Sequence, residues 1–274
     1  PELFLTIFFI LILLIFLGSG VWVAISMVGV SAIGMLIFTT RPVGDAMATT
    51  IWGTSSSWTL TALPLFVWMG EILYRTKLSE NLFKGLAPWM SRMPGGLIHV
   101  NVVGCALFAA ISGSSAATVA TVGKMSIPEL RKRKYPEKIL LGSLAGSGTL
   151  GLLIPPSIIL IIYGVTVQES IAKLFIAGII PGIMIAIFFM LYIIVWSILN
   201  KEIMPQARKK FSFSKKIKAS VQLIPVIILI TSVIGSIYIG VATATEAASL
   251  GVVGALFLSF FQKSLNKESF KLSL

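Results

Sequence analysis

The sequence predicts an all-α membrane protein, a polytopic bundle of helices, and three observations point to this fold class. Of the 274 residues, 56% are hydrophobic and only 12% are charged, whereas soluble domains carry about 25% charged residues. The apolar residues form long runs instead of the short alternating segments of an outer-membrane barrel. The 22 Lys and Arg residues cluster between these runs. A soluble cytosolic enzyme is therefore excluded.

Membrane helices are expected where an apolar run approaches the ~20 residues that span a bilayer. The segment 61–74 is shorter but apolar, and the segment 43–60 is a weaker candidate because polar residues interrupt it. No basic stretch precedes the first run, so it is interpreted as a membrane helix and not as a signal peptide. The clear candidates are 3–17, 21–38, 174–199, 219–239 and 246–262.

The basic residues predict how these segments are oriented. All of them except Lys173 can be placed on one side of the membrane, which the positive-inside rule identifies as the cytoplasm. The net charge of +12 then reflects topology and contact with lipid headgroups, and nucleic acid is not an expected partner. The cytoplasmic groups are Arg41; Arg75, Lys77, Lys84 and Arg92; Lys124, Arg131, Lys132, Arg133, Lys134 and Lys138; Lys201, Arg208, Lys209, Lys210, Lys215, Lys216 and Lys218; and Lys263, Lys267 and Lys271.

The segment 96–123 is predicted to form a re-entrant helical hairpin. Cytoplasmic charges flank it at Arg92 and Lys124, so it must enter and leave the membrane at the same face. The residues Ser112-Gly113-Ser114-Ser115 interrupt it, and each arm of about 14 residues reaches about 20 Å. The second arm would present its first N–H groups, which favour a carboxylate, at mid-membrane depth. The alternative is that small residues merely let two helices pack closely.

The segment 139–163 is predicted to be a broken helix. Pro155 and Pro156 lack the N–H groups that would bond the carbonyls of Gly151 and Leu152. Freed carbonyls and serine hydroxyls form a hard oxygen site that suits a small cation such as Na⁺. A simple proline kink is the alternative, but the glycines before the prolines favour an unwound ion site.

A broken helix and a re-entrant hairpin together are typical of a secondary transporter. An intramembrane hydrolase would need paired aspartates, a Ser/His pair or a zinc motif, and the sequence has one Asp, Asp45, and one His, His99. Two glutamates border membrane segments. Glu71 is either functional or in a structural ion pair, and Glu246 follows Thr245, which is expected to cap the next helix.

These residues resemble the large membrane subunit of TRAP transporters, the DctM-like family. The similarity covers nearly the whole chain, in matching order and spacing. It is carried by ALPLFVWMGEIL at 62–73, GGLIHVN at 95–101, SGSSAATVATVG at 112–123, IPEL at 127–130, GTLGLLIPPSIILIIYGV at 148–165, SIAKLFIAGIIPG at 170–182 and TATEAA at 243–248.

The resemblance implies a transporter permease subunit and not an enzyme. Such a subunit imports an organic acid (a C4-dicarboxylate, sialic acid or similar carboxylate) with Na⁺ as the coupling ion and no other cofactor. It works in the bacterial inner membrane with a small four-helix membrane subunit and a periplasmic solute-binding protein. A sodium-coupled carboxylate carrier without a binding protein is the second hypothesis, and an intramembrane hydrolase is a distant third.

The resemblance also implies site residues. The hairpin tip matches the family's SGS-small motif, and residues 151–157 match its G-x-x-[IV]-P-P-S motif. Thr118 stands where many members have Asp, which leaves substrate preference open. Sodium binding is expected at Ser112, Ser114, Gly151, Ile154 and Pro156, and substrate binding at Gly113, Ser114, Ser115, Thr118 and Ser157.

The implied fold is an elevator of two inverted repeats, each with a hairpin and a broken helix. Only one hairpin and one Pro-Pro break occur in this sequence, so we expect one repeat and the start of a second. The expected organisation is scaffold helices at 1–60, a first transport unit at 61–199, a basic cytoplasmic loop at 200–218 and the start of the second repeat at 219–274. These residues alone are expected not to transport.

Overall fold

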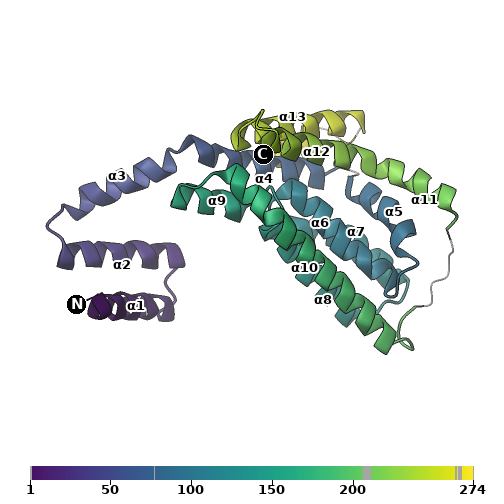
Figure 1. Cartoon of the computed structure of the whole chain (residues 1–274), viewed down its shortest axis with the longest axis horizontal. Helices are drawn as coiled ribbons and strands as arrows, with labels where there is room; N and C mark the ends of the chain where they lie inside the picture. Colours follow the sequence, from purple (N-terminus) through teal and green to yellow (C-terminus); the bar gives the residue numbers. More distant parts are fainter. Residues whose placement is uncertain (1, 77, 206–210, 263, 265–266, 274) are drawn as a thin grey trace. The chain divides into compact units, whose positions relative to one another are not determined.

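The computed structural model describes residues 2–76, 78–205, 211–262, 264 and 267–273, and all regular structure in these residues is helical (Figure 1). The chain divides into two compact units, Pro1–Ser57 and Trp58–Leu274. The all-α prediction is therefore confirmed. The helical runs follow the apolar segments of the sequence, because a helix satisfies its own backbone polar groups in lipid.

The first unit contains α1 (Glu2–Gly18), α2 (Val23–Phe38) and α3 (Val43–Ser55). Phenylalanines of α1 pack against glycines of α2: Phe9 covers Gly34, and Phe16 covers Gly29. Large apolar side chains such as Trp22 and Leu3 remain exposed, as expected of helices that face lipid. The three predicted helices of this region are present, although α3 ends at Ser55 and not at residue 60.

The second unit is built around α6 (His99–Ser112), which is almost completely buried. It packs against five other helices of the unit. These are α4 (Ala62–Tyr74), α5 (Leu78–Met90), α7 (Ser115–Lys132), α8 (Glu137–Gly148) and α10 (Ile171–Leu199). The other helices are α9 (Ile158–Val167), α11 (Phe213–Ser220), α12 (Ile224–Tyr238), α13 (Ala244–Phe261) and α14 (Lys267–Ser273).

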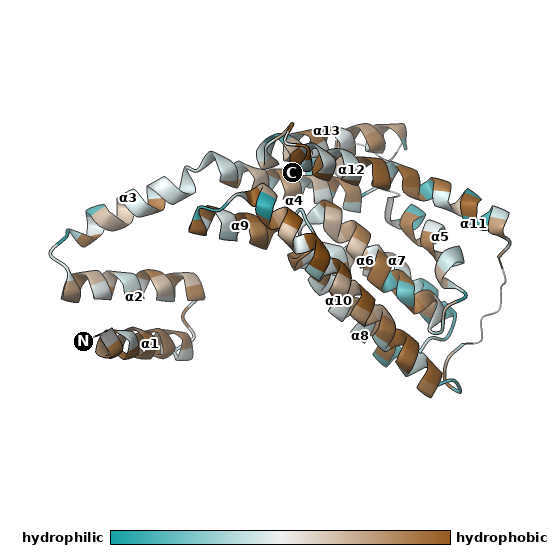
Figure 2. Cartoon of the chain, viewed as in Figure 1, coloured by the Kyte–Doolittle hydropathy of each residue, from teal (hydrophilic) through white to brown (hydrophobic). Residues whose placement is uncertain are grey.

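Among the described residues, three helices are long and apolar enough to cross a membrane: 171–199, 213–238 and 244–261. The helix α10 carries hydrophobic residues around much of its surface (Figure 2), and Ile180, Tyr192 and Leu199 are among its exposed side chains. A helix that is apolar on most sides is stable only when lipid or protein covers it. The unit is therefore a membrane-embedded bundle.

Several helix boundaries differ from the prediction. The helix α7 continues to Lys132, beyond the predicted limit of 123. The helix α11 begins at Phe213, inside the segment 200–218 that was predicted to be a loop, and α12 follows it after a single 3₁₀ turn. The amphipathic helix α5 and the short helix α14 were not predicted. Their charged residues lower the local hydropathy, while packing against the bundle stabilises the helical conformation.

Candidate functional site

The turn between α6 and α7 is the tip of a tight helix–turn–helix. Gly113 ends α6 in the left-handed conformation, with φ +60°, and its N–H donates to the carbonyl of Ala109 at 3.1 Å. Ser114 is the N-cap of α7, and its hydroxyl accepts from the Ala117 N–H at 3.4 Å. The chain thus reverses direction in two residues, because glycine adopts positive φ at little cost and serine caps the next helix.

Two buried hydroxyls hold this turn from inside. The hydroxyl oxygens of Ser112 and Thr118 are 3.0 Å apart, and Ser112 is also 3.3 Å from the carbonyl of Ser114. The Thr118 N–H donates to that same carbonyl at 3.0 Å. Ser112 and Thr118 are both enclosed by the protein. Their observed contacts therefore shape the tip.

The segment between α8 and α9 leaves regular helix geometry, as predicted. After Gly148 the chain forms one 3₁₀ turn, Thr149–Leu152, and α9 begins only at Ile158. The Ser157 hydroxyl donates to the Leu152 carbonyl at 2.7 Å. This bond replaces the one that the proline at position 156 cannot make. One of the carbonyls that the two prolines release is therefore occupied by a hydroxyl of the chain itself.

The tip and the break lie in direct backbone contact. A Cβ atom placed on Gly151 would lie 2.9 Å from the Ser115 nitrogen, and one on Gly113 would lie 2.8 Å from the Pro156 oxygen. The Ile158 N–H donates to the carbonyl of Gly113 at 3.2 Å. Only glycine permits two backbones to approach this closely. The structure thus brings together two motifs that are separated by about 40 residues of sequence.

Two other helices, α10 and α4, pack closely against these two segments. On α10, a Cβ atom at Gly178 would lie 2.6 Å from the Leu153 oxygen, and one at Gly182 would lie 2.8 Å from the Ile154 side chain. On α4, a Cβ atom at Gly70 would lie 2.9 Å from the Cα of Ser112. Small residues at helix crossings are typical of membrane bundles, because they allow close backbone packing.

The residues predicted for the sodium and substrate sites fall into two groups. Gly113, Ser114, Ser115, Gly151, Pro156 and Ser157 lie at the contact or directly beside it, and Ser112 and Thr118 lie behind it. The side chain of Ile154 faces α10, and its N–H donates to Leu150 at 2.8 Å. The Ser115 hydroxyl is enclosed and has no partner in the described part of the chain. Unpaired buried oxygens are costly unless a ligand or water binds them.

A buried polar cluster on α6 and α8 was not predicted. The Asn101 side-chain amide donates to the Ser143 hydroxyl at 3.0 Å and to the Leu140 carbonyl at 3.3 Å. The Ser147 hydroxyl donates to the Ser143 carbonyl at 2.6 Å. Asn101 and Ser147 are completely buried. The sequence signal that could have predicted this cluster is Asn101 itself, because an Asn in an apolar helix needs a hydrogen-bond partner inside the bundle.

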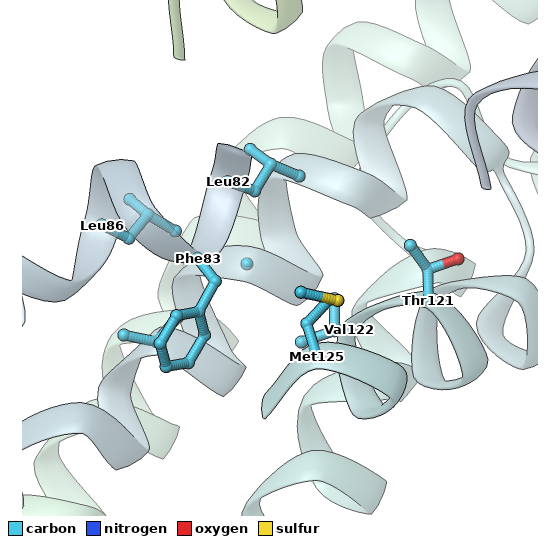
Figure 3. Close-up of a pocket in the computed structure, with 8 residues that line it drawn as sticks. Leu82, Phe83, Leu86, Thr121, Val122 and Met125 are labelled. Carbon is cyan, nitrogen blue, oxygen red and sulfur yellow. The ribbon is translucent and has the colours of Figure 1, made fainter. Parts of the chain in front are cut away.

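The second unit also contains an apolar pocket between α5, α6 and α7 (Figure 3). The hydroxyl of Thr121 points away from Leu82 and Phe83 in this view. An apolar lining without convergent polar groups does not suit a charged solute. The lining residues are Leu82, Phe83, Leu86, Val100, Gly104, Thr121, Val122 and Met125.

The remaining polar candidates have structural partners. Glu71 forms an ion pair with Arg75 at 2.6 Å. Of the two roles expected for Glu71, functional residue or structural ion pair, the structure shows the ion pair. Glu246 closes a capping box with Thr243, so the predicted cap at Thr245 is wrong. The His99 ring bonds the Pro94 carbonyl at 2.7 Å. His99 and Ser112 begin and end the same helix, about 20 Å apart, which excludes them as a hydrolytic pair.

Known proteins are similar to this chain in sequence. Over 230 residues the chain is 33% identical to the C4-dicarboxylate TRAP transporter large permease protein DctM of Pseudomonas aeruginosa, covering 84% of this chain and 53% of that protein. The sialic acid TRAP transporter large permease protein SiaM of Vibrio cholerae is 33% identical, with coverages of 88% and 56%. The ectoine TRAP transporter large permease protein TeaC of Halomonas elongata is 37% identical, with coverages of 73% and 46%.

The chain spans about half the length of the curated relatives it matches. Residues 8–273 match the family model described as the tripartite ATP-independent periplasmic transporter, DctM component. The match therefore includes the α6–α7 turn, the Pro-Pro break and the three helices of membrane-spanning length. The chain belongs to the DctM family of large permease components of tripartite ATP-independent periplasmic transporters.

Proposed function

We propose that this chain forms one half of the substrate and ion pathway in a TRAP transporter that imports an organic acid across the bacterial inner membrane. The observation that carries the proposal is the backbone contact between the α6–α7 tip and the break at 151–157. Non-helical backbone at membrane depth is tolerated where it lines a site inside the protein. Two such segments in contact support a binding site at that position.

Sodium is the proposed coupling ion, and the groups at the contact are suited to it. The candidate ligands are the oxygens of Ser112, Ser114, Gly151, Ile154 and Pro156. All are uncharged oxygen donors, which a hard monovalent cation accepts. The Ser114 and Pro156 oxygens both lie where the two segments meet. A bound cation would supply positive charge that offsets an anionic solute beside it.

The proposed substrate is a small carboxylate. The first turn of α7 begins at this site, and its free N–H groups carry partial positive charge that attracts an anion. The enclosed Ser115 hydroxyl adds a donor. The remaining candidates are Gly113, Ser114, Thr118 and Ser157, and Thr118 would act through Ser112, since the two hydroxyls are bonded. The relatives' names include a C4-dicarboxylate, sialic acid and ectoine, so the acid itself is left open.

The partners proposed from the family are a small four-helix membrane subunit and a periplasmic solute-binding protein. In this proposal α6 and α7 form a re-entrant hairpin that opens to the cytoplasm, and the second unit moves as an elevator. Cysteine labelling of Arg92→Cys and Lys124→Cys from each side of the membrane tests the hairpin. Labelling of the two positions from opposite sides would show that 96–123 spans the membrane.

A carrier that works without a binding protein is the second candidate. Uptake by the intact large subunit, reconstituted with its small subunit, would distinguish the two. Sodium and the binding protein are omitted in turn, and the proposal expects uptake to be lost in both cases. Uptake that persists without the binding protein would favour the simple carrier. Uptake that persists without sodium would overturn the coupling ion.

A further inference from the structure

We propose that Lys216 and the adjacent surface of α11 and α12 form a binding site for one anionic phospholipid. The site lies where α11 packs on α5, away from the α6–α7 tip (Figure 1). It is independent of the transported solute. The argument rests on a nearly buried lysine that lacks a carboxylate partner, and on an exposed apolar stripe beside it.

Lys216 is the unusual member of α11. Only 9% of its surface is exposed, although lysine is rarely buried without an opposite charge. Its Nζ lies 5.1 Å from the centre of the Trp89 ring, a cation–π contact. Within the described residues, none of the ion pairs involves Lys216. The positive charge is therefore held in place, and no carboxylate in the described part of the chain neutralises it.

The surroundings of Lys216 are fixed by packing and hydrogen bonds. The Trp89 Nε1 donates to the Ser220 hydroxyl at 2.8 Å, and that hydroxyl donates to the Lys216 carbonyl at 3.1 Å. Phe213 contacts the Trp89 ring edge-on, with the ring centres 6.5 Å apart. A Cβ atom on Gly85 would meet Leu223, so α5 and the 3₁₀ turn after α11 are in close contact. The ammonium group is thus pre-positioned and loses little entropy on binding.

An apolar stripe begins beside this ammonium group. Its residues recur at intervals of three or four along α11, the 3₁₀ turn and α12, so they share one face of the helical segment 213–238. The stripe is about 22 Å long at 1.5 Å per residue, enough to follow an acyl chain through one leaflet. All of its members are exposed: Phe213, Ile217, Val221, Ile224 and Ile228.

The charge pattern selects the occupant. α11 carries Lys215, Lys216 and Lys218 and no acidic residue. The lysines precede the most apolar part of a membrane-length helix, which places them at the height of the headgroups. A phosphodiester provides the missing negative charge, and its acyl chain covers the stripe. An acidic protein segment would supply the charge but would not extend along a lipid-facing helix.

The test measures lipid that remains bound to the protein. The full chain is incorporated into phosphatidylethanolamine bilayers that contain phosphatidylglycerol, extracted in mild detergent, and analysed by mass spectrometry for retained lipid. Wild-type protein should retain phosphatidylglycerol in excess of its bilayer fraction. Lys216→Gln should lower the retained amount about fivefold, because it removes the one ammonium group that packing against Trp89 holds in place for the headgroup.

Matched variants keep the test specific. Lys215→Gln removes the same charge from the same helix but from a different face, and it should change retention little. Lys216→Arg keeps the charge and should restore retention, which shows that loss in the glutamine variant is not misfolding. Ile217→Ser interrupts the stripe without changing charge and should also lower retention.

Three outcomes would overturn the proposal. Equal losses in Lys216→Gln and Lys215→Gln would indicate a diffuse basic surface. No preference for phosphatidylglycerol over phosphatidylethanolamine would exclude the anionic headgroup. Displacement of the bound lipid by inorganic phosphate at comparable concentration would show a phosphate site without an acyl contribution.

Discussion

The α-carbon of Gly113 lies so close to the Pro156 carbonyl that a Cβ atom at Gly113 would be 2.8 Å from the Pro156 oxygen. In the same contact, the Ile158 N–H donates to the Gly113 carbonyl. One residue thus ends α6, reverses the chain and accepts a hydrogen bond from the start of α9. The tip and the break are one structural element formed by two distant parts of the sequence.

Gly113→Ala should destabilise the protein through this contact. Alanine at φ +60° costs ~1 kcal/mol, and the close approach to Pro156 adds ~1–3 kcal/mol of steric strain. The control is Gly240→Ala, since Gly240 has φ +79° but no atom within 4 Å of its added Cβ. Thermal unfolding of the two variants in detergent isolates the steric component. Equal decreases in melting temperature for Gly113→Ala and Gly240→Ala would mean that the close approach to Pro156 does not add to the destabilisation.

Gly151→Ala should affect the same region from the other side. The new methyl group would lie 2.9 Å from the Ser115 nitrogen and 3.0 Å from the Ser114 carbonyl carbon. Both are backbone atoms, which cannot move aside by rotamer changes as a flexible side chain can. We expect a loss of ~1–3 kcal/mol in unfolding free energy and loss of uptake in the intact transporter. Gly142→Ala is the control, because α8 is open to solvent or lipid at that position and alanine favours helix. Normal uptake by Gly151→Ala would contradict the proposed site.

Asn101 and Ser143 should be energetically coupled. The amide of Asn101 donates to the Ser143 hydroxyl inside the bundle, where water cannot replace the lost partner. A double-mutant cycle with Asn101→Ala and Ser143→Ala should give a coupling energy of ~1 kcal/mol. Unfolding free energies in mixed micelles provide the four values. Additive effects would show that the two side chains stabilise the protein independently.

Ser157→Ala should loosen the break. It removes the hydroxyl that donates to the Leu152 carbonyl, which has lost its usual backbone donor to proline. The expected loss in stability is ~1 kcal/mol. Ser157→Thr keeps the hydroxyl and should retain most of the stability, whereas Ser31→Ala removes a comparable bond on an exposed helix face and should have little effect. Hydrogen exchange at residues 150–158 would report the loosening directly, and unchanged exchange in Ser157→Ala would contradict it.

Much of the fold could be predicted from the sequence because its causes are local. Long apolar runs require helices in lipid, and Pro155 and Pro156 remove specific backbone donors wherever they occur. The tip was predictable for the same reason, since Gly113 and Ser114 are the residues that end one helix and cap the next. The wrong cap at Thr245 shows the limit of this reasoning. Two threonines were available, and only the reciprocal bonds with Glu246 selected Thr243.

The sequence by itself therefore determined the all-α membrane class, the positions of the turn and the break, and the family. Only the tertiary structure decided which backbone groups meet: Gly113 with Pro156, and Gly151 with Ser115. It also showed that Lys216 lies over Trp89, in a helix that hydropathy assigned to a loop. The reason is physical. Hydropathy and helix-breaking act within a few residues along the chain, whereas these contacts depend on how whole helices pack against one another.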